Sequence, residues 1–159
     1  MTGAASSEGG RPLAYRLGQL LAIGEIAARR EHDPVLMQTG FTHPDQMLSA
    51  LLPAMDRASS GLGRRWSAVY NPLPGEGLDT ALDAYGETQL TLGYWHERTH
   101  IHRAERMTRA RQEAGKSRAQ WAALLGVSPR MVEAWELHAR NVSEEHDELR
   151  KIIKKRETA

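Results

Sequence analysis

Residues 103–139 carry the pattern that most limits what this 159-residue chain can fold into. Gly115 is expected to end one helical stretch, because glycine readily adopts the left-handed backbone that closes many helices. Ser117 and Gln120 follow with the S-x-x-Q spacing of a capping box, which predicts the start of another helix. The apolar residues of that helix are Trp121, Ala122, Leu124 and Leu125.

A second short helix is predicted directly after this one. Gly126 supplies a tight turn, and Ser128 followed by Pro129 is typical of an N-cap and a first helical position. The apolar face of the second helix holds Met131, Val132 and Trp135, whereas Arg130, Glu133 and Ala134 are expected to face outward. Two short helices around a glycine turn make a helix–turn–helix, whose second helix can enter the major groove of DNA.

The string VSPRMVEAWE, from Val127 to Glu136, resembles the DNA-binding domain of Xre/lambda-repressor-type regulators, and most closely the HigA-type antitoxin branch. The resemblance covers residues 103–139 and implies a helix–turn–helix domain over residues 103–156. It places Arg118 and Gln120 near phosphates, and the DNA-binding set that it implies is Arg118, Gln120, Ser128, Pro129, Arg130 and Glu133. A helix pair that serves only for packing or for docking a protein is the alternative.

The chemistry of this set favours one base-reading residue. Arginine commonly pairs with guanine, and Arg130 is the side chain that fits this role. Glu133 and Glu136 oppose tight binding, since uncompensated acids near phosphates weaken the electrostatic attraction.

Leucine-rich periodicity predicts further helices before residue 100. They cover residues 13–30, 44–58 and 78–98, with Pro34 ending the first, Thr42 or Asp45 capping the second and Pro53 kinking it. Residues 59–77 contain four glycines and two prolines, which indicates a long connection with a short helix at most. Tyr15, Tyr94 and Trp95 stand among leucines at helical spacing and are expected in the core.

Strand-like alternation is absent throughout, so the predicted fold class is all-α. The chain is expected to consist of a disordered tail over residues 1–10, a small helical bundle over residues 11–100 and the helix–turn–helix domain over residues 103–156.

Two strings in the first hundred residues carry a second resemblance. AYRLGQLLAIGEIAA (Ala14 to Ala28) and GETQLTLGYWHER (Gly86 to Arg98) resemble the start and the close of the C-terminal helical region in the large subunit of type I-C CRISPR Cascade complexes. The body of the large subunit has no counterpart here, so residues 13–98 correspond to the separately made small subunit of that system. The resemblance implies a non-catalytic helical subunit that supports guide RNA and target DNA. The partners that the resemblance implies are the Cascade backbone and large subunits, and further copies of this chain within the complex.

A protein of that kind needs to recognise only backbone shape, because base pairing supplies specificity, and to hold the displaced strand with cations and stacking rings. The candidate contacts are Arg29, Arg30, Arg64, Arg65, Trp66, Arg98 and Arg103. Each arginine also fits a solvated helix face. Arg64, Arg65 and Trp66 form the best group, since two cations and a ring are expected together in a flexible loop.

The charge distribution and the composition agree with a cytoplasmic protein that binds nucleic acid. Residues 99–159 hold 13 Lys/Arg against 9 Asp/Glu, whereas residues 1–98 hold 8 against 11. The chain contains no cysteine, which excludes disulfides and thiolate metal sites and suits a reducing compartment. No apolar run approaches the roughly 20 residues of a membrane span, and the first ten residues lack the features of a secretory signal.

Catalysis and cofactors are not expected, although one motif suggests otherwise. His96, Glu97 and His100 fit the H-E-x-x-H pattern of zinc proteases, with His102 or Glu105 as a third ligand. Arg98 suits the middle of such a helix poorly, and we predict no metal site.

Two further functions stay open. The chain is alternatively an Xre-type transcriptional regulator that uses its helical bundle for dimerisation or sensing, or a phage inhibitor that mimics the Cascade subunit.

Overall fold

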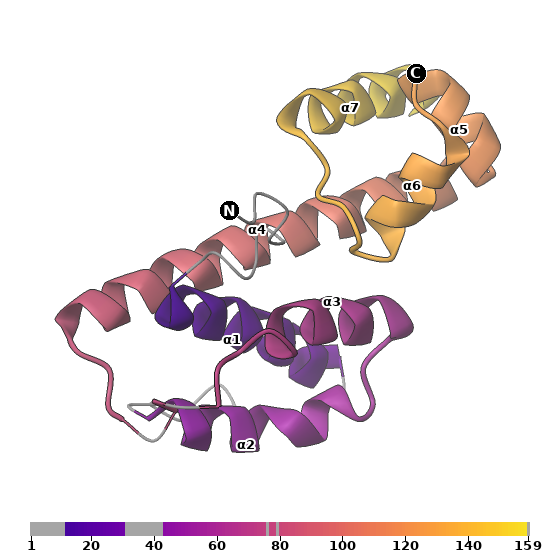
Figure 1. Ribbon diagram of the computed structural model, residues 1–159. Coiled ribbons are helices and arrows are strands. Elements are labelled where there is room, and N and C mark those ends of the chain that lie inside the picture. Colours follow the sequence, from indigo (N-terminus) through magenta and orange to yellow (C-terminus); the bar gives the residue numbers. More distant parts are fainter. Residues whose placement is uncertain (1–11, 31–42, 76, 79, 159) are drawn as a thin grey trace, which may run out of the picture. The chain divides into compact units, whose positions relative to one another are not determined.

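The computed structural model describes residues 12–30, 43–75, 77–78 and 80–158, without the side chains of residues 29, 30, 157 and 158. Within these ranges the chain forms seven α-helices and no strand (Figure 1). The predicted all-α fold class is therefore confirmed. The chain divides into two compact units, residues 1–98 (unit 1) and residues 99–159 (unit 2).

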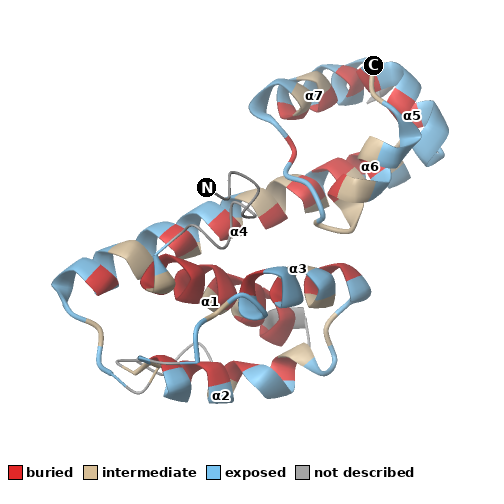
Figure 2. Ribbon diagram, viewed as in Figure 1, coloured by how far each residue is buried: buried red, intermediate tan, exposed pale blue. Residues whose placement is uncertain are grey.

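Unit 1 is built around helix α1 (Leu13–Arg30), which packs against both α2 (Pro44–Met55) and α3 (Ser60–Tyr70). The apolar side chains of α1 fill the centre, and Leu17, Leu20 and Ile23 are fully buried. Burial extends around almost the whole of α1, as Figure 2 shows. Even Arg16 and Gln19, which stand on the polar side of the helical wheel, are buried. Such all-round burial is typical of a helix covered on several sides.

Helix α4 (Ala84–Glu113) passes from unit 1 into unit 2, and its first half crosses α1 at very close range. At the crossing, a Cβ placed on Gly18 would overlap the carbonyl oxygen of Leu90, and a Cβ placed on Gly93 would overlap that of Tyr15. The two backbones touch because neither glycine has a side chain to hold them apart. Gly93 thus belongs to a packing contact and not to a break in the helix.

Several predicted boundaries in unit 1 are wrong. Helix α2 ends at Met55, earlier than expected, and its N-cap is His43 and not Asp45; Thr42 lies outside the described residues. Residues 60–70 form the 11-residue helix α3, which takes up more of the segment than the short helix at most that was expected there, because Leu62, Trp66 and Val69 are buried along one side of it. Helix α4 starts at Ala84 and continues past residue 98.

The three aromatic residues that are predicted in the core differ in their burial. Tyr15 is buried as expected, and Tyr94 is half-buried. Trp95 is 55% exposed, so its placement in the core is wrong. One residue along α4 rotates a side chain by a large fraction of a turn, and the face that meets α1 is the one that carries Gly93 and Glu97.

Unit 2 contains the second half of α4 together with α5 (Arg118–Leu125), α6 (Pro129–Glu136) and α7 (Glu144–Thr158). Its core is assembled from all four helices and from the segment before α7. The buried residues are Ala104, Met107, Ala110, Trp121, Ala122, Leu125, Val132, Trp135, Val142 and Ile153. The Trp121 indole donates a hydrogen bond to the Met107 sulfur at 3.2 Å, so the ring joins α5 to α4.

Candidate nucleic-acid interface

The local signals read from residues 117–136 set the geometry of helices α5 and α6. The Ser117 hydroxyl accepts from the Gln120 backbone N–H at 3.1 Å, and the Gln120 side chain accepts from the Ser117 N–H at 2.8 Å. This reciprocal pair confirms the predicted capping box. Gly126 has φ 72°, a left-handed conformation that lets the chain turn directly from α5 into α6.

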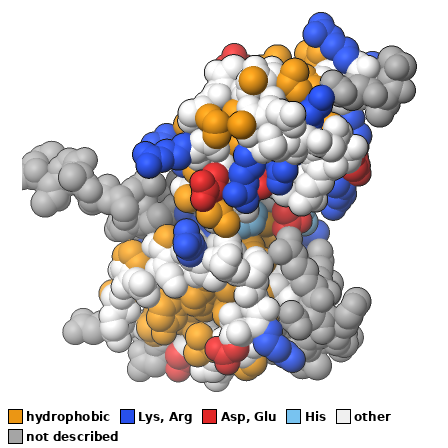
Figure 3. All heavy atoms as spheres, turned by 90° about the vertical axis from the view of Figure 1, so that its right-hand side faces the viewer, with side chains coloured by type: hydrophobic (Ala, Val, Ile, Leu, Met, Phe, Trp, Pro, Cys, Tyr) orange, Lys and Arg blue, Asp and Glu red, His pale blue; other side chains and the backbone are white. Residues whose placement is uncertain are grey.

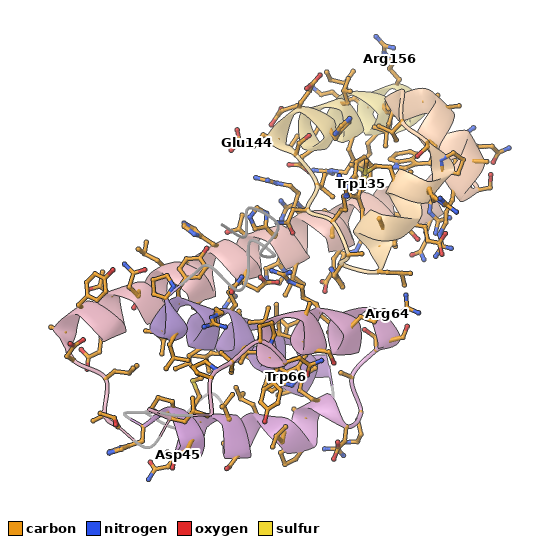
Figure 4. The ribbon with its side chains drawn as sticks, viewed as in Figure 1. Asp45, Arg64, Trp66, Trp135, Glu144 and Arg156 are labelled. Atoms are coloured by element: carbon orange, nitrogen blue, oxygen red, sulfur yellow. The ribbon has the colours of Figure 1, made fainter. Side chains whose placement is uncertain are left out.

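Helix α6 begins as its sequence predicts. The Ser128 hydroxyl accepts from the Met131 N–H at 3.2 Å, and Pro129 occupies the first turn. Val132 and Trp135 then face the core of unit 2. Figure 4 shows Trp135 directed inward from α6. The first turn of α6 is thereby fixed by its cap on one side and by buried side chains on the other.

All six residues of the predicted DNA-binding set are exposed. They are Arg118, Gln120, Ser128, Pro129, Arg130 and Glu133, at the starts of α5 and α6 and along α6. Of the apolar partners expected behind them, Met131 is partly buried and Leu124 is exposed, so Leu124 does not lie on the apolar face predicted for it; the others are buried. The set therefore forms a polar surface on the outer side of the α5–α6 pair.

An ion-pair cluster lies beside this surface. Arg111 donates to both carboxylate oxygens of Glu136, at 2.7 and 3.1 Å, and Arg118 donates to one of them at 3.1 Å. The Glu136 side chain is only 6% exposed. The expectation that Glu136 acts as an uncompensated acid is therefore wrong, because two guanidinium groups neutralise it. Arg111 also donates to the Lys116 carbonyl at 2.9 Å, which ties the end of α4 to the start of α5.

Sequence reasoning missed Arg111. It lies 25 residues before Glu136, and its last-turn position in α4 carries no capping or motif signal. By contrast, Arg130 has no ion-pair partner within the part of the chain that the structure describes, and its charge faces solvent. On the face shown in Figure 3, Lys and Arg side chains of unit 2 stand at several separate places on the surface. On this face the cations therefore do not form one dense basic patch.

The residues of unit 1 that are predicted to contact the displaced DNA strand differ from this set in their exposure. Arg65 donates to both oxygens of Glu97, at 2.7 and 2.6 Å, and Glu97 is 2% exposed. Trp66 is 6% exposed and stacks on Tyr70, so the expectation of a stacking ring in a flexible loop is wrong. Arg64 on the same helix is exposed.

Two of the other predicted contacts hold structure together. Arg98 donates to Glu25 at 3.3 Å and to the Tyr94 hydroxyl at 2.6 Å, and its guanidinium lies over the Trp95 ring. In unit 2, Arg103 donates to the Val142 carbonyl at 3.1 Å. The side chains of Arg29 and Arg30 lie outside the described residues.

Arg64 stands at an open groove between the end of α2 and the start of α3. The groove has a volume of about 620 Å³. Its walls combine apolar side chains, two hydroxyls and one charge of each sign, from Leu52, Met55, Asp56, Ser60, Gly63, Arg64, Trp66 and Ser67. Among the described residues of unit 1, Arg64 is therefore the predicted contact to the displaced DNA strand whose side chain is exposed to solvent.

The H-E-x-x-H motif is organised for packing. The Glu97 carboxylate is held by Arg65 and by Gln19, which donates at 3.2 Å, and His96 Nδ1 shares a hydrogen bond of 2.7 Å with the Tyr15 hydroxyl. A glutamate in this state is not open to a substrate water. Across the described ranges, no three His, Asp or Glu side chains come together in a way that could hold a metal ion.

Burial raises the pKa of Tyr94, and the hydrogen bond that its hydroxyl donates to Glu25 at 2.8 Å raises this pKa further. The phenol therefore stays protonated in its contact with α1.

No protein-family model, curated protein or solved structure matches this chain. None of the helices in the described residues combines the length and the apolar character needed to cross a membrane.

Proposed function

We propose that unit 2 contacts duplex DNA through the starts of helices α5 and α6, as a helix–turn–helix does. The observation that carries the proposal is the division of side chains on these two helices. The six residues of the DNA-binding set are exposed, while Trp121, Val132 and Trp135 anchor the same helices from behind. Such a division leaves the outer surface rigid and polar, which suits a groove lined by base edges and phosphates.

Charge compensation supports this proposal. Glu136 has its charge neutralised by Arg111 and Arg118, so it adds little repulsion toward phosphate. Arg130 lies in the first turn of α6 with an unpaired charge within the described residues. An arginine at the leading end of a helix that enters a major groove can reach guanine with two hydrogen bonds. Arg118 is half-exposed and can turn to a phosphate while Arg111 keeps Glu136 paired.

Duplex binding by the full-length chain tests the proposal, measured by fluorescence anisotropy over a salt series. Arg130→Ala is expected to weaken binding by roughly 5- to 100-fold on a preferred site and to relax the preference. Arg118→Ala is expected to weaken all sequences alike and to lower the salt slope by about 1. Arg57→Ala, at an exposed position in unit 1, is the matched control. Equal binding by all three variants and the parent chain would reject the DNA contact.

For unit 1 we propose the role of a non-catalytic small subunit in a type I-C-like CRISPR complex. The supporting observation is that the two strings which carry this resemblance pack on each other. Gly18 meets Leu90, Gly93 meets Tyr15, and Glu25 accepts from Tyr94. Segments about 70 residues apart in the sequence thus form one helix pair, as the start and close of a single helical region should.

Coexpression with the backbone and large subunits of such a complex tests this role. The proposal expects the chain to copurify with those subunits and with guide RNA. Arg64→Glu is expected to reduce protection of the displaced strand, with Arg57→Glu as the control of equal charge change. A chain that stays free of the ribonucleoprotein contradicts the assembly role.

The same experiments distinguish the two remaining alternatives, which are a free regulator and an inhibitor of the complex. A footprint on a short palindrome without assembly into the complex favours a free regulator. Assembly that lowers interference in cells favours an inhibitor that mimics the subunit. The assembly and interference results do not depend on the DNA contact proposed for unit 2, whereas the footprint does, so failure to assemble leaves the DNA contact to be tested by its own variants.

A further inference from the structure

Helix α7 has an asymmetric charge pattern that no role described above uses. Its first half holds four acids, Glu144, Glu145, Asp147 and Glu148, and its second half holds five bases and one acid, Arg150, Lys151, Lys154, Lys155, Arg156 and Glu157. Acids near the start and bases near the end suit the helix dipole. The arrangement also gives the helix two oppositely charged halves on its outer side.

One stripe along α7 combines these charges with apolar groups. Glu145, Leu149, Ile152 and Arg156 follow each other at steps of four, three and four residues, which places them on one face of the helix. Ile152 is 48% exposed, Leu149 is half-buried against the core, and both charged residues are exposed. Neither Glu145 nor Arg156 has an ion-pair partner in the described ranges. In Figure 4 the labelled Glu144 and Arg156 lie at opposite ends of α7 and point away from unit 2.

The stripe is complementary to itself when reversed. Its order is acid, apolar, apolar, base, so an antiparallel copy brings Glu145 opposite Arg156 and Leu149 opposite Ile152, each twice. A neighbouring exposed stripe, Glu144, Glu148, Lys151 and Lys155, has the order acid, acid, base, base, but its centre lies between residues 149 and 150, so in the register of the first stripe its acids and bases are offset by two residues, about 3 Å along the helix. Glu148 and Lys151 are paired with each other within the helix at 2.9 Å, so the first stripe sets the register of the proposed pair.

We propose that the outer face of α7 binds a second copy of this chain, with the two α7 helices antiparallel about a two-fold axis between residues 150 and 151. A two-fold interface uses the same patch on both subunits, which requires a self-complementary surface of this kind. The spacing of the stripe is also that of paired helices in coiled coils. A polynucleotide is a poorer occupant, because the acidic half of the face repels phosphates. The proposal does not rest on either function proposed above.

Sedimentation equilibrium of the full-length chain over a concentration series tests the interface. The parent chain is expected to form dimers in a concentration-dependent manner. Glu145→Arg and Arg156→Glu each turn two attractive contacts into repulsive ones and are expected to weaken the dimer by about tenfold or more. Arg109→Glu makes the same charge change at an exposed position on α4 and is expected to leave the dimer intact.

Mixing provides the decisive measurement. When the Glu145→Arg and Arg156→Glu variants are combined, every end contact is again between opposite charges, so heterodimers are expected at the parent affinity. Ile152→Asp is expected to abolish association in any combination. Circular dichroism checks that each variant remains folded. A monomeric parent chain, single variants that dimerise normally, or a mixture without heterodimers would each overturn the proposal.

Orientation is tested with introduced cysteines, since the chain has none of its own. Ile152→Cys lies on the stripe that faces the partner, about 5 Å along the helix from its copy, and is expected to form an intersubunit disulfide readily. Glu145→Cys lies on the same stripe, about 16 Å from its copy in the antiparallel pair, and is expected not to do so. Equal cross-linking at both positions indicates a parallel pair and overturns the proposed arrangement.

Discussion

Arg111 and Glu136 form a two-point ion pair that joins the last turn of α4 to the last turn of α6 in unit 2. Both side chains are largely removed from solvent. A carboxylate in this position needs its partners, because the cost of burying a charge is repaid only by close opposite charge and hydrogen bonds. The pair thereby fixes the helix that carries Arg130.

Glu136→Gln is expected to destabilise unit 2 by about 2–4 kcal/mol, because it leaves Arg111 without a charged partner. Urea unfolding followed by circular dichroism measures the change. Glu133→Gln makes the same substitution at an exposed position and should alter stability by no more than about 0.5 kcal/mol. If both variants unfold alike, the ion pair does not organise this unit.

The close crossing of α1 and α4 yields a prediction about unit 1. Gly93→Ala is expected to cost about 3 kcal/mol, because the new methyl group overlaps the Tyr15 backbone, which cannot move without shifting α1. Gly63→Ala is the matched control, since nothing lies within 4 Å of a Cβ there. Because alanine favours a helix more than glycine does, this substitution in α3 is expected to raise the free energy of unfolding by up to about 1 kcal/mol. The midpoint temperature of thermal unfolding should therefore fall for Gly93→Ala and rise for Gly63→Ala.

Local signals in the sequence account for much of unit 2. Ser117, Ser128 and Gly126 act through atoms within a few residues of themselves, so their caps and turn are predictable from the sequence. The pairing of Arg111 with Glu136 is not, because it depends on how the helices fold together. The candidate interface was thus predictable as a set of exposed residues, but its charge balance was not.

Unit 1 shows where local reasoning fails. The glycines of residues 59–77 argue against a helix, yet burial of Leu62 and Trp66 stabilises α3 beyond its weak propensity. Arg16 and Gln19 are polar and lie apart from the apolar positions of α1 on a helical wheel, yet both are buried in the folded unit. The position of Trp95 follows from the register of α4 on α1, which the Gly18 and Gly93 contact sets. Each of these outcomes is decided by tertiary packing.

Tyr94 gives unit 1 a defined response to alkaline pH. Because the folded-state pKa is raised, the folded chain holds this proton longer than the unfolded chain does. The stabilisation is complete below the ordinary tyrosine pKa of about 10 and is lost as the pH rises through the folded-state value. Tyr94→Phe removes the titration together with the hydrogen bond to Glu25. The stability difference between the parent chain and this variant should therefore narrow above pH 10, as measured by urea unfolding. A constant difference would show that the phenol does not titrate differently on folding.

The end of α6 contains the one residue other than glycine with a positive φ in the described part of the chain, His138 at 58°. It allows the Ala139 N–H to return to the Ala134 carbonyl at 2.8 Å, which closes the helix. A residue with a Cβ is strained in this conformation, whereas glycine is not. His138→Gly and His138→Ala both remove the imidazole, so their comparison isolates the backbone. The glycine variant is expected to be more stable than the alanine variant by about 1 kcal/mol in urea unfolding. At Ala139, where φ is negative, substitution by glycine should instead destabilise the chain. Equal stability of the two His138 variants would mean that the turn relaxes without cost, and that its left-handed geometry does not hold α6 in place.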